Sequence, residues 1–128
     1  MATPVFFKCK DSESILHLIK GNQNDIMNSM GDQVRILDST TSEGAGEKHI
    51  PVAVQEGKNV HVTVGSVAHP MTQEHSIEWI YLETKKGGQW KDLCCTGEPN
   101  AEFVLSESDE AVAVYAYCNL HGFWKTQL

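Results

Sequence analysis

Short apolar segments separated by turn residues run from residue 50 to residue 118, and this pattern constrains the fold more than any other feature. In segment 60–64 three valines alternate with polar residues, which places one face of an extended strand against a core. Residues 56–59, which include a glycine, are typical of a hairpin turn. Further strands are expected at residues 50–55, 76–84, 90–95, 102–105 and 111–118. This pattern predicts an all-β protein with an immunoglobulin-like antiparallel β-sandwich.

The first 36 residues have a different pattern and are expected to form a separate small segment. Residues 5–7 and 15–19 are each expected to be a strand, the second ending at Gly21. A helix over residues 12–20 is the alternative, because its apolar residues also fit helical spacing. Residues 37–48 are polar and contain glycines, as in a linker or mobile loop. The predicted organisation is therefore segment 1–36, linker 37–48 and sandwich domain 49–128.

Size and charge limit the classes of function. A chain of 128 residues with 41% hydrophobic residues suits one compact domain and a small appendage. The net charge of −7 and the absence of a basic cluster argue against nucleic-acid binding. No apolar run is long enough to cross a bilayer, and the first residues do not resemble a secretory signal, so a cytoplasmic protein is expected. The four cysteines lack the spacing of a secreted disulfide framework and are expected to be reduced.

Five potential metal ligands lie in the segments expected to join the strands. They are His49, His69, His75, Cys118 and His121. Four imidazoles and one thiolate are more donors than a tetrahedral zinc site needs, and they suit a five-coordinate iron with one open position. From the residues alone, iron and zinc remain equally good alternatives. A c-type haem is excluded because the chain has no Cys-x-x-Cys-His run. His17 and His61 are expected to be ordinary surface or core residues.

Four sequence motifs resemble those of the superoxide reductase family, which includes desulfoferrodoxin and neelaredoxin. They are Glu-Lys-His-Ile-Pro-Val at 47–52, Gly-Ser-Val-Ala-His-Pro-Met at 65–71, His-Ser-Ile-Glu-Trp-Ile at 75–80 and Cys-Asn-Leu-His-Gly at 118–122. The resemblance implies one mononuclear non-haem iron, with the four histidines in a plane and Cys118 axial. It also implies an enzyme that reduces superoxide by one electron to hydrogen peroxide at the open sixth position.

The same resemblance suggests roles for residues around the ligands. Lys48 would attract superoxide and help to orient a water molecule as proton donor, and Glu47 would close over oxidised iron as a sixth ligand. From their position beside the ligand segments, and not from the resemblance, Trp79 and Trp124 are expected to shield the iron, although both could equally be plain core residues. The alternative function is a non-catalytic metal-binding or electron-transfer module on the same sandwich.

The N-terminal segment departs from the family pattern. Desulfoferrodoxins hold a second iron there with four cysteines, in an N-terminal desulforedoxin-like domain. This chain keeps Cys9, has Ser12 at the next expected ligand position, and reads Asn28-Ser29 where a vicinal cysteine pair belongs. Segment 1–36 is therefore expected to be a degenerate desulforedoxin-like segment without metal. Electrons would come from an external donor such as rubredoxin, and the resemblance also implies a homodimer.

Overall fold

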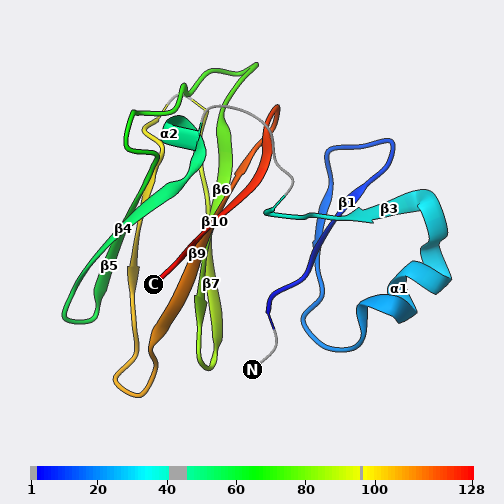
Figure 1. Ribbon diagram of the computed structural model, residues 1–128, viewed down its shortest axis with the longest axis horizontal. Coiled ribbons are helices and arrows are strands. Elements are labelled where there is room, and N and C mark those ends of the chain that lie inside the picture. Colours follow the sequence, from blue (N-terminus) through cyan, green and yellow to red (C-terminus); the bar gives the residue numbers. More distant parts are fainter. Residues whose placement is uncertain (1–2, 41–45, 96) are drawn as a thin grey trace. The chain divides into compact units, whose positions relative to one another are not determined.

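The computed structural model describes residues 3–40, 46–95 and 97–128 (Figure 1). By contacts between residues the chain divides into two compact units, Met1–Asp38 and Ser39–Leu128. We call them unit 1 and unit 2 and describe each by itself.

Unit 1 is a small antiparallel sheet with one helix. Strand β1 (Phe6–Cys9) lies between β2 (Ile15–His17) and β3 (Val34–Ile36), and helix α1 (Gln23–Met30) and the 3-10 turn η1 (Gly31–Gln33) precede β3. The side chain of Asn22 accepts a hydrogen bond from the backbone N–H of Asn24 and so caps the start of α1. Residues 15–17 are a strand, so the alternative helix over residues 12–20 is wrong. Helix α1 and strand β3 were not expected from the sequence.

Unit 2 contains two antiparallel sheets, which confirms the predicted all-β fold. One sheet has the order β10-β9-β6-β7 and the other β4-β5-β8. The first consists of β6 (Ile77–Thr84), β7 (Gly87–Asp92), β9 (Ala111–Cys118) and β10 (Gly122–Gln127). The second consists of β4 (Pro51–Glu56), β5 (Asn59–Val64) and β8 (Asn100–Val104). Figure 1 shows the short helix α2 (Gly46–His49) leading directly into β4.

The two sheets bury one apolar core between them. Val60, Val62 and Val64 are at most 1% exposed, as their alternation along β5 predicts. They pack in one cluster with residues of the other sheet, among them Ile80 and Val114. Each fully buried valine contributes about 1.5–3 kcal/mol to stability. This rigid core fixes the strand ends from which the candidate ligands extend.

Two strands of the larger sheet differ from the prediction. Strand β7 begins at Gly87, whereas residues 90–95 were expected, so residues 85–86 alone form the turn. Position 88 of β7 has to be a glycine, because the Tyr81 side chain occupies the space that a Cβ atom would need. Strand β10 was missed altogether. It follows the last expected strand after a turn of only three residues and pairs with β9 from Gly122 to Gln127.

Candidate metal centre

The candidate ligands lie where strands begin or end at the same edge of unit 2. His49 is the last residue of α2, just before β4, and His69 follows β5 and donates its backbone N–H to the carbonyl of Val64. His75 precedes β6, Cys118 ends β9, and His121 lies in the turn before β10. The strand register pairs Ile77 with Cys118, Gly122 with Cys118 and Pro51 with Val64, which holds these ends side by side.

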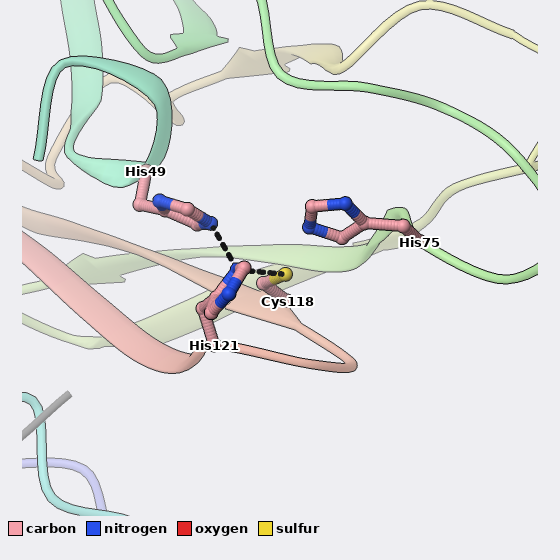
Figure 2. A group of neighbouring side chains, drawn as sticks. All are labelled: His49, His75, Cys118 and His121. Carbon is pink, nitrogen blue, oxygen red and sulfur yellow. Dashed lines mark hydrogen bonds between the residues drawn. The ribbon is translucent and has the colours of Figure 1, made fainter. Parts of the chain in front are cut away.

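Four donor side chains point toward one another at this edge (Figure 2). The donor atoms of His49, His75, Cys118 and His121 all lie within 4.8 Å of one another. Nδ1 of His121 lies 3.0 Å from Nε2 of His49 and 3.9 Å from the Cys118 sulfur. Two nitrogen ligands of one ion, each bound at about 2.1 Å, are about 3 Å apart when they meet at a right angle. The shorter distance therefore fits two neighbouring ligands of one metal.

With His69, the imidazoles form a closed ring of four. Ring centroids are 4.6 Å apart for His49–His69 and for His69–His75, 5.0 Å for His75–His121 and 4.7 Å for His49–His121. Neighbouring rings stand at 73–80° to each other. His49 and His75 are 6.3 Å apart and more nearly parallel, at 31°, as residues across a ring should be. Four imidazoles can meet one central atom in this arrangement.

Two of these rings bury a nitrogen that needs a partner. Nε2 of His69 and Nε2 of His75 are buried and form no hydrogen bond among the described residues. The Nδ1 of His69 lies 2.6 Å from the carbonyl oxygen of Pro70, so Nδ1 carries the proton and Nε2 has a free lone pair. A buried nitrogen without a partner is costly, and a metal ion would satisfy both. The residues present therefore fit a metal ion.

Burial favours the neutral form of two imidazoles of this ring, His69 and His75. The surrounding protein lowers the pKa of His69 to about 4, chiefly because burial disfavours the charged form, although the bond to Pro70 opposes this. Burial also lowers the pKa of His75, and repulsion from His121 and Lys48 adds to the effect. Neutral imidazole is the form that binds a metal.

Cys118 is fully buried, and its sulfur lies 3.9 Å from Nδ1 of His121. Burial raises the pKa of its thiol, whereas the backbone N–H groups of His121 and Leu120 act in the opposite direction by hydrogen bonding to the sulfur. A bound cation would favour the thiolate further. In the described part of the chain, Cys9, Cys95 and Cys118 form no disulfide.

The residues expected around the ligands have different positions. Trp124 stacks on His49 with ring centroids 4.9 Å apart and donates its indole N–H to the carbonyl of His121. Trp79 stacks instead on Tyr117. Lys48 is exposed, and its charge acts on His75. Glu47 lies in α2, but its side chain is outside the described residues, so its role stays a prediction.

Comparison with known proteins agrees with this geometry. The family model for desulfoferrodoxin matches residues 41–127. The chain belongs to the desulfoferrodoxin family. The desulfoferrodoxin of Nitratidesulfovibrio vulgaris is 39% identical over 122 residues and matches over 94% of each chain. The superoxide reductase from Treponema pallidum has a similar structure, with a TM-score of 0.71 and 46% identity over 77% of this chain and 83% of that one.

A second solved structure resembles a shorter part of this desulfoferrodoxin-family chain. The superoxide reductase (1Fe-SOR) from Giardia intestinalis matches with a TM-score of 0.55 and 33% identity. The match covers 97% of that chain and 64% of this one. Among the described residues, no helix is long and apolar enough to cross a membrane.

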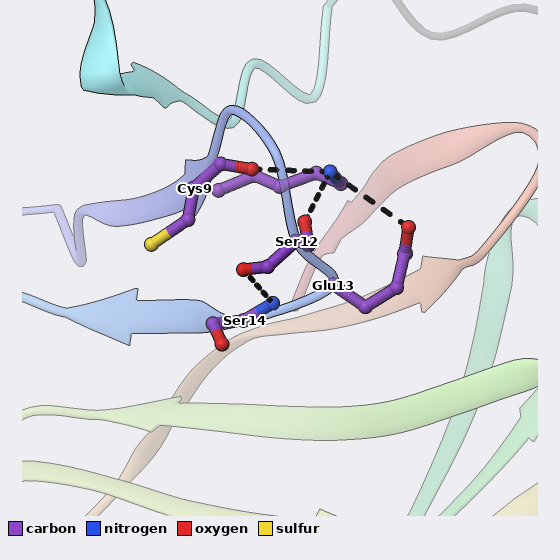
Figure 3. A network of polar contacts seen from close by, with 5 residues as sticks. Cys9, Ser12, Glu13 and Ser14 are labelled. Atoms are coloured by element: carbon purple, nitrogen blue, oxygen red, sulfur yellow. Dashed lines mark hydrogen bonds and ion pairs between the residues drawn. The ribbon is translucent and has the colours of Figure 1, made fainter.

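The hairpin between β1 and β2 is where a second desulfoferrodoxin iron would be expected (Figure 3). Cys9 is there, but the next expected ligand position is Ser12, whose hydroxyl accepts a hydrogen bond from the backbone N–H of Ser14. The ammonium group of Lys8 donates to the carbonyl oxygens of Cys9 and Ser12, at 3.2 and 2.7 Å, and lies 4.0 Å from the Glu13 carboxylate. One thiolate does not fit a four-cysteine iron site, and a lysine holds the turn instead.

The two remaining histidines, His17 and His61, are exposed. His17 stacks on Phe6 in unit 1, with ring centroids 4.4 Å apart. His61 lies on β5 and pairs with Glu102 across the sheet, with 3.3 Å between Nδ1 and the carboxylate.

Proposed function

We propose that this chain is a superoxide reductase whose iron is bound by His49, His69, His75, His121 and Cys118. The observation that carries the proposal is the closed ring of four imidazoles with a buried thiol close to it. Three of the donors would be Nε2 atoms and the fourth Nδ1 of His121. Iron in this site would supply one electron to superoxide, which takes up two protons and leaves as hydrogen peroxide.

The surrounding protein would leave one face of the proposed iron site open to an anion. Cys118 is buried, whereas His75 and His121 are partly exposed and Lys48 is exposed. The substrate would therefore approach on the side of the ring opposite the thiolate. A ferrous ion with four neutral imidazoles and one thiolate has a net charge of +1. Lys48 would place a second positive charge near it, although the chain as a whole carries −7. Such a local field raises the association rate of a small anion.

Cys118 and Trp124 would tune and protect the site. A thiolate ligand pushes electron density toward the metal and alters its reactivity. The indole of Trp124 covers one face of His49 and limits the access of water from that direction. By resemblance to the family, Lys48 would also orient a water molecule as proton donor, and Glu47 would bind the oxidised iron as a sixth ligand.

The proposal extends to the partners of this enzyme. Unit 1 would hold no iron, because only Cys9 of the expected four ligands is present at its hairpin. Each subunit would then store one electron and depend on a separate electron donor such as rubredoxin. The family resemblance also supports a homodimer, which light scattering of the purified protein would test. The free thiols at Cys9, Cys95 and Cys118 are compatible with a reducing, cytoplasmic location.

Superoxide consumption by the iron-loaded protein tests the function directly. The expected products are hydrogen peroxide and no oxygen, with one superoxide consumed per reduced subunit in the absence of a donor. Oxygen release would instead show dismutation, and a protein that holds only zinc and does not react would support the non-catalytic module.

Lys48→Ala tests the role of the local charge. We expect its second-order rate constant with superoxide to fall by about tenfold at low salt and to depend less on ionic strength. Lys86→Ala is the matched control, because it removes the same charge from the turn at the other end of β6. Equal rates for Lys48→Ala and Lys86→Ala would contradict the steering role.

A further inference from the structure

Asn119 connects two segments of the candidate metal centre. It lies between Cys118 and His121 in the turn after β9. Its side-chain oxygen accepts a hydrogen bond of 3.0 Å from the backbone N–H of Ser76, and its side-chain amide donates one of 2.9 Å to the carbonyl of Glu74. Its own backbone N–H donates to the carbonyl of Ser76 at 3.2 Å. The Asn119 side chain thus forms hydrogen bonds to the backbone immediately before and immediately after His75.

His75 needs such support more than its neighbours do. It belongs to no strand or helix, and no hydrogen bond involves its ring nitrogens among the described residues. The ring of His69, by contrast, is oriented by its bond to Pro70. A metal-binding histidine is usually oriented through its second nitrogen. The loop backbone therefore determines where the His75 ring lies, together with the edge contacts of that ring with His69 and His121.

Thr72 holds the other side of the same loop. Its hydroxyl accepts from the backbone N–H of His75 at 3.1 Å and contacts the carbonyl of His75 at 3.2 Å, and its own backbone N–H donates to that carbonyl at 2.9 Å. These contacts close residues 72–75 into a turn, but they connect the loop only to itself. Asn119 connects the turn to the strand end that carries Cys118.

We propose that Asn119 is a positioning residue of the metal centre, which sets the place of His75 relative to Cys118 and His121. This inference rests on the proposed ligand set. The amide is suited to the task because it offers one acceptor to Ser76 and one donor to Glu74 at the same time. A carboxylate at residue 119 would have no hydrogen for the Glu74 carbonyl, and an alanine would contact neither group. Loss of an outer partner of a metal ligand typically lowers metal affinity by about 10–100-fold.

Titration of the metal-free 128-residue chain with Co²⁺, against a competing chelator, tests this role without superoxide. We expect Asn119→Ala to bind Co²⁺ about 10–100-fold more weakly and to show altered ligand-field bands and an altered thiolate-to-cobalt absorption band. Asn119→Asp is the second variant, because it keeps the contact to Ser76 but sets a carboxylate oxygen against the Glu74 carbonyl. It should fold and also bind Co²⁺ more weakly.

Gln127→Ala is the matched control. Gln127 is also an amide side chain that donates to a backbone carbonyl, that of Val112, but it lies at the end of β10 away from the ligands. Its Co²⁺ affinity and spectrum should equal those of the parent protein. Affinities within twofold of the parent for both Asn119 variants would overturn the proposal, and so would an equal loss in Gln127→Ala. A protein that binds Co²⁺ as expected but fails to reduce superoxide when loaded with iron would refute the proposed function and leave the role of Asn119 standing.

Discussion

The ring of histidines should make the metal-free protein sensitive to mild acid. The pKa of His69 is about 4 in the folded protein, because the ring is buried, against an ordinary value of 6.5. As the pH falls, His69 therefore binds a proton in the unfolded chain at a higher pH than in the folded protein. Stability contributed by neutral His69 is present at neutral pH and is lost progressively between the two values.

The size of this loss follows from the two pKa values. Between about pH 7 and about pH 4.5, protonation of the unfolded state should lower the free energy of unfolding by about 2.5 kcal/mol through His69 alone. Other groups titrate in the same range, so the comparison must be between variants. His69→Gln removes the titration and keeps a polar side chain. Between about pH 7 and about pH 4.5, the free energy of unfolding of His69→Gln should therefore fall by about 2.5 kcal/mol less than that of the parent protein.

Urea unfolding followed by tryptophan fluorescence provides the assay. All three tryptophans of the chain, Trp79, Trp90 and Trp124, lie in unit 2, so the signal reports on the unit that contains the ring. Equal pH dependence in the parent and in His69→Gln would refute the reasoning, since it would mean that His69 is not held neutral by burial. Bound Co²⁺ should shift the loss of stability to lower pH, because the metal competes with protons for the same nitrogen.

Three further changes test other parts of the molecule. Cys118→Ser should abolish superoxide reduction and the thiolate-to-metal absorption band, and full activity would show that the wrong thiolate was chosen. Lys8→Met should speed amide hydrogen exchange in the β1–β2 hairpin, because it removes the ammonium group that holds the turn, whereas Lys10→Met, which removes only an exposed ion pair, should not. Tyr115→Phe removes the 2.8 Å hydrogen bond to the buried Glu83 carboxylate and should cost about 1–3 kcal/mol in urea unfolding; an unchanged midpoint would contradict this.

The sequence predicts the sandwich well where strands bury one clear face. Alternation in residues 60–64 gives β5, and the long apolar run gives β6 to within one residue. Strand β7 was misplaced because its glycines look like a turn. Only glycine fits under the Tyr81 side chain at position 88. This contact between two strands cannot be inferred from the sequence. Strand β10 was missed because its residues, Gly-Phe-Trp-Lys-Thr-Gln at 122–127, do not alternate between apolar and polar side chains.

The candidate site was predictable as a set of residues but not as a geometry. The five donors stand in recognisable motifs, and the structure brings four of them within 4.8 Å, with His69 completing the ring. Asn119 was missed because its partners, Glu74 and Ser76, are more than forty positions away in the chain. Its position between Cys118 and His121 was the signal that could have directed attention to it.

The wide spacing of the donors along the chain has a consequence for biosynthesis. His49 and His121 touch across 72 positions, and β4 must be beside β5 and β9 beside β6 before the ring exists. Contacts between residues this distant in the chain cost more loop-closure entropy and slow folding. A nascent chain emerging from the ribosome has no complete ring until the segment that carries His121 has been made. Binding of one ion by all five candidate ligands therefore has to follow the synthesis of the turn between β9 and β10 and the pairing of the strands around it.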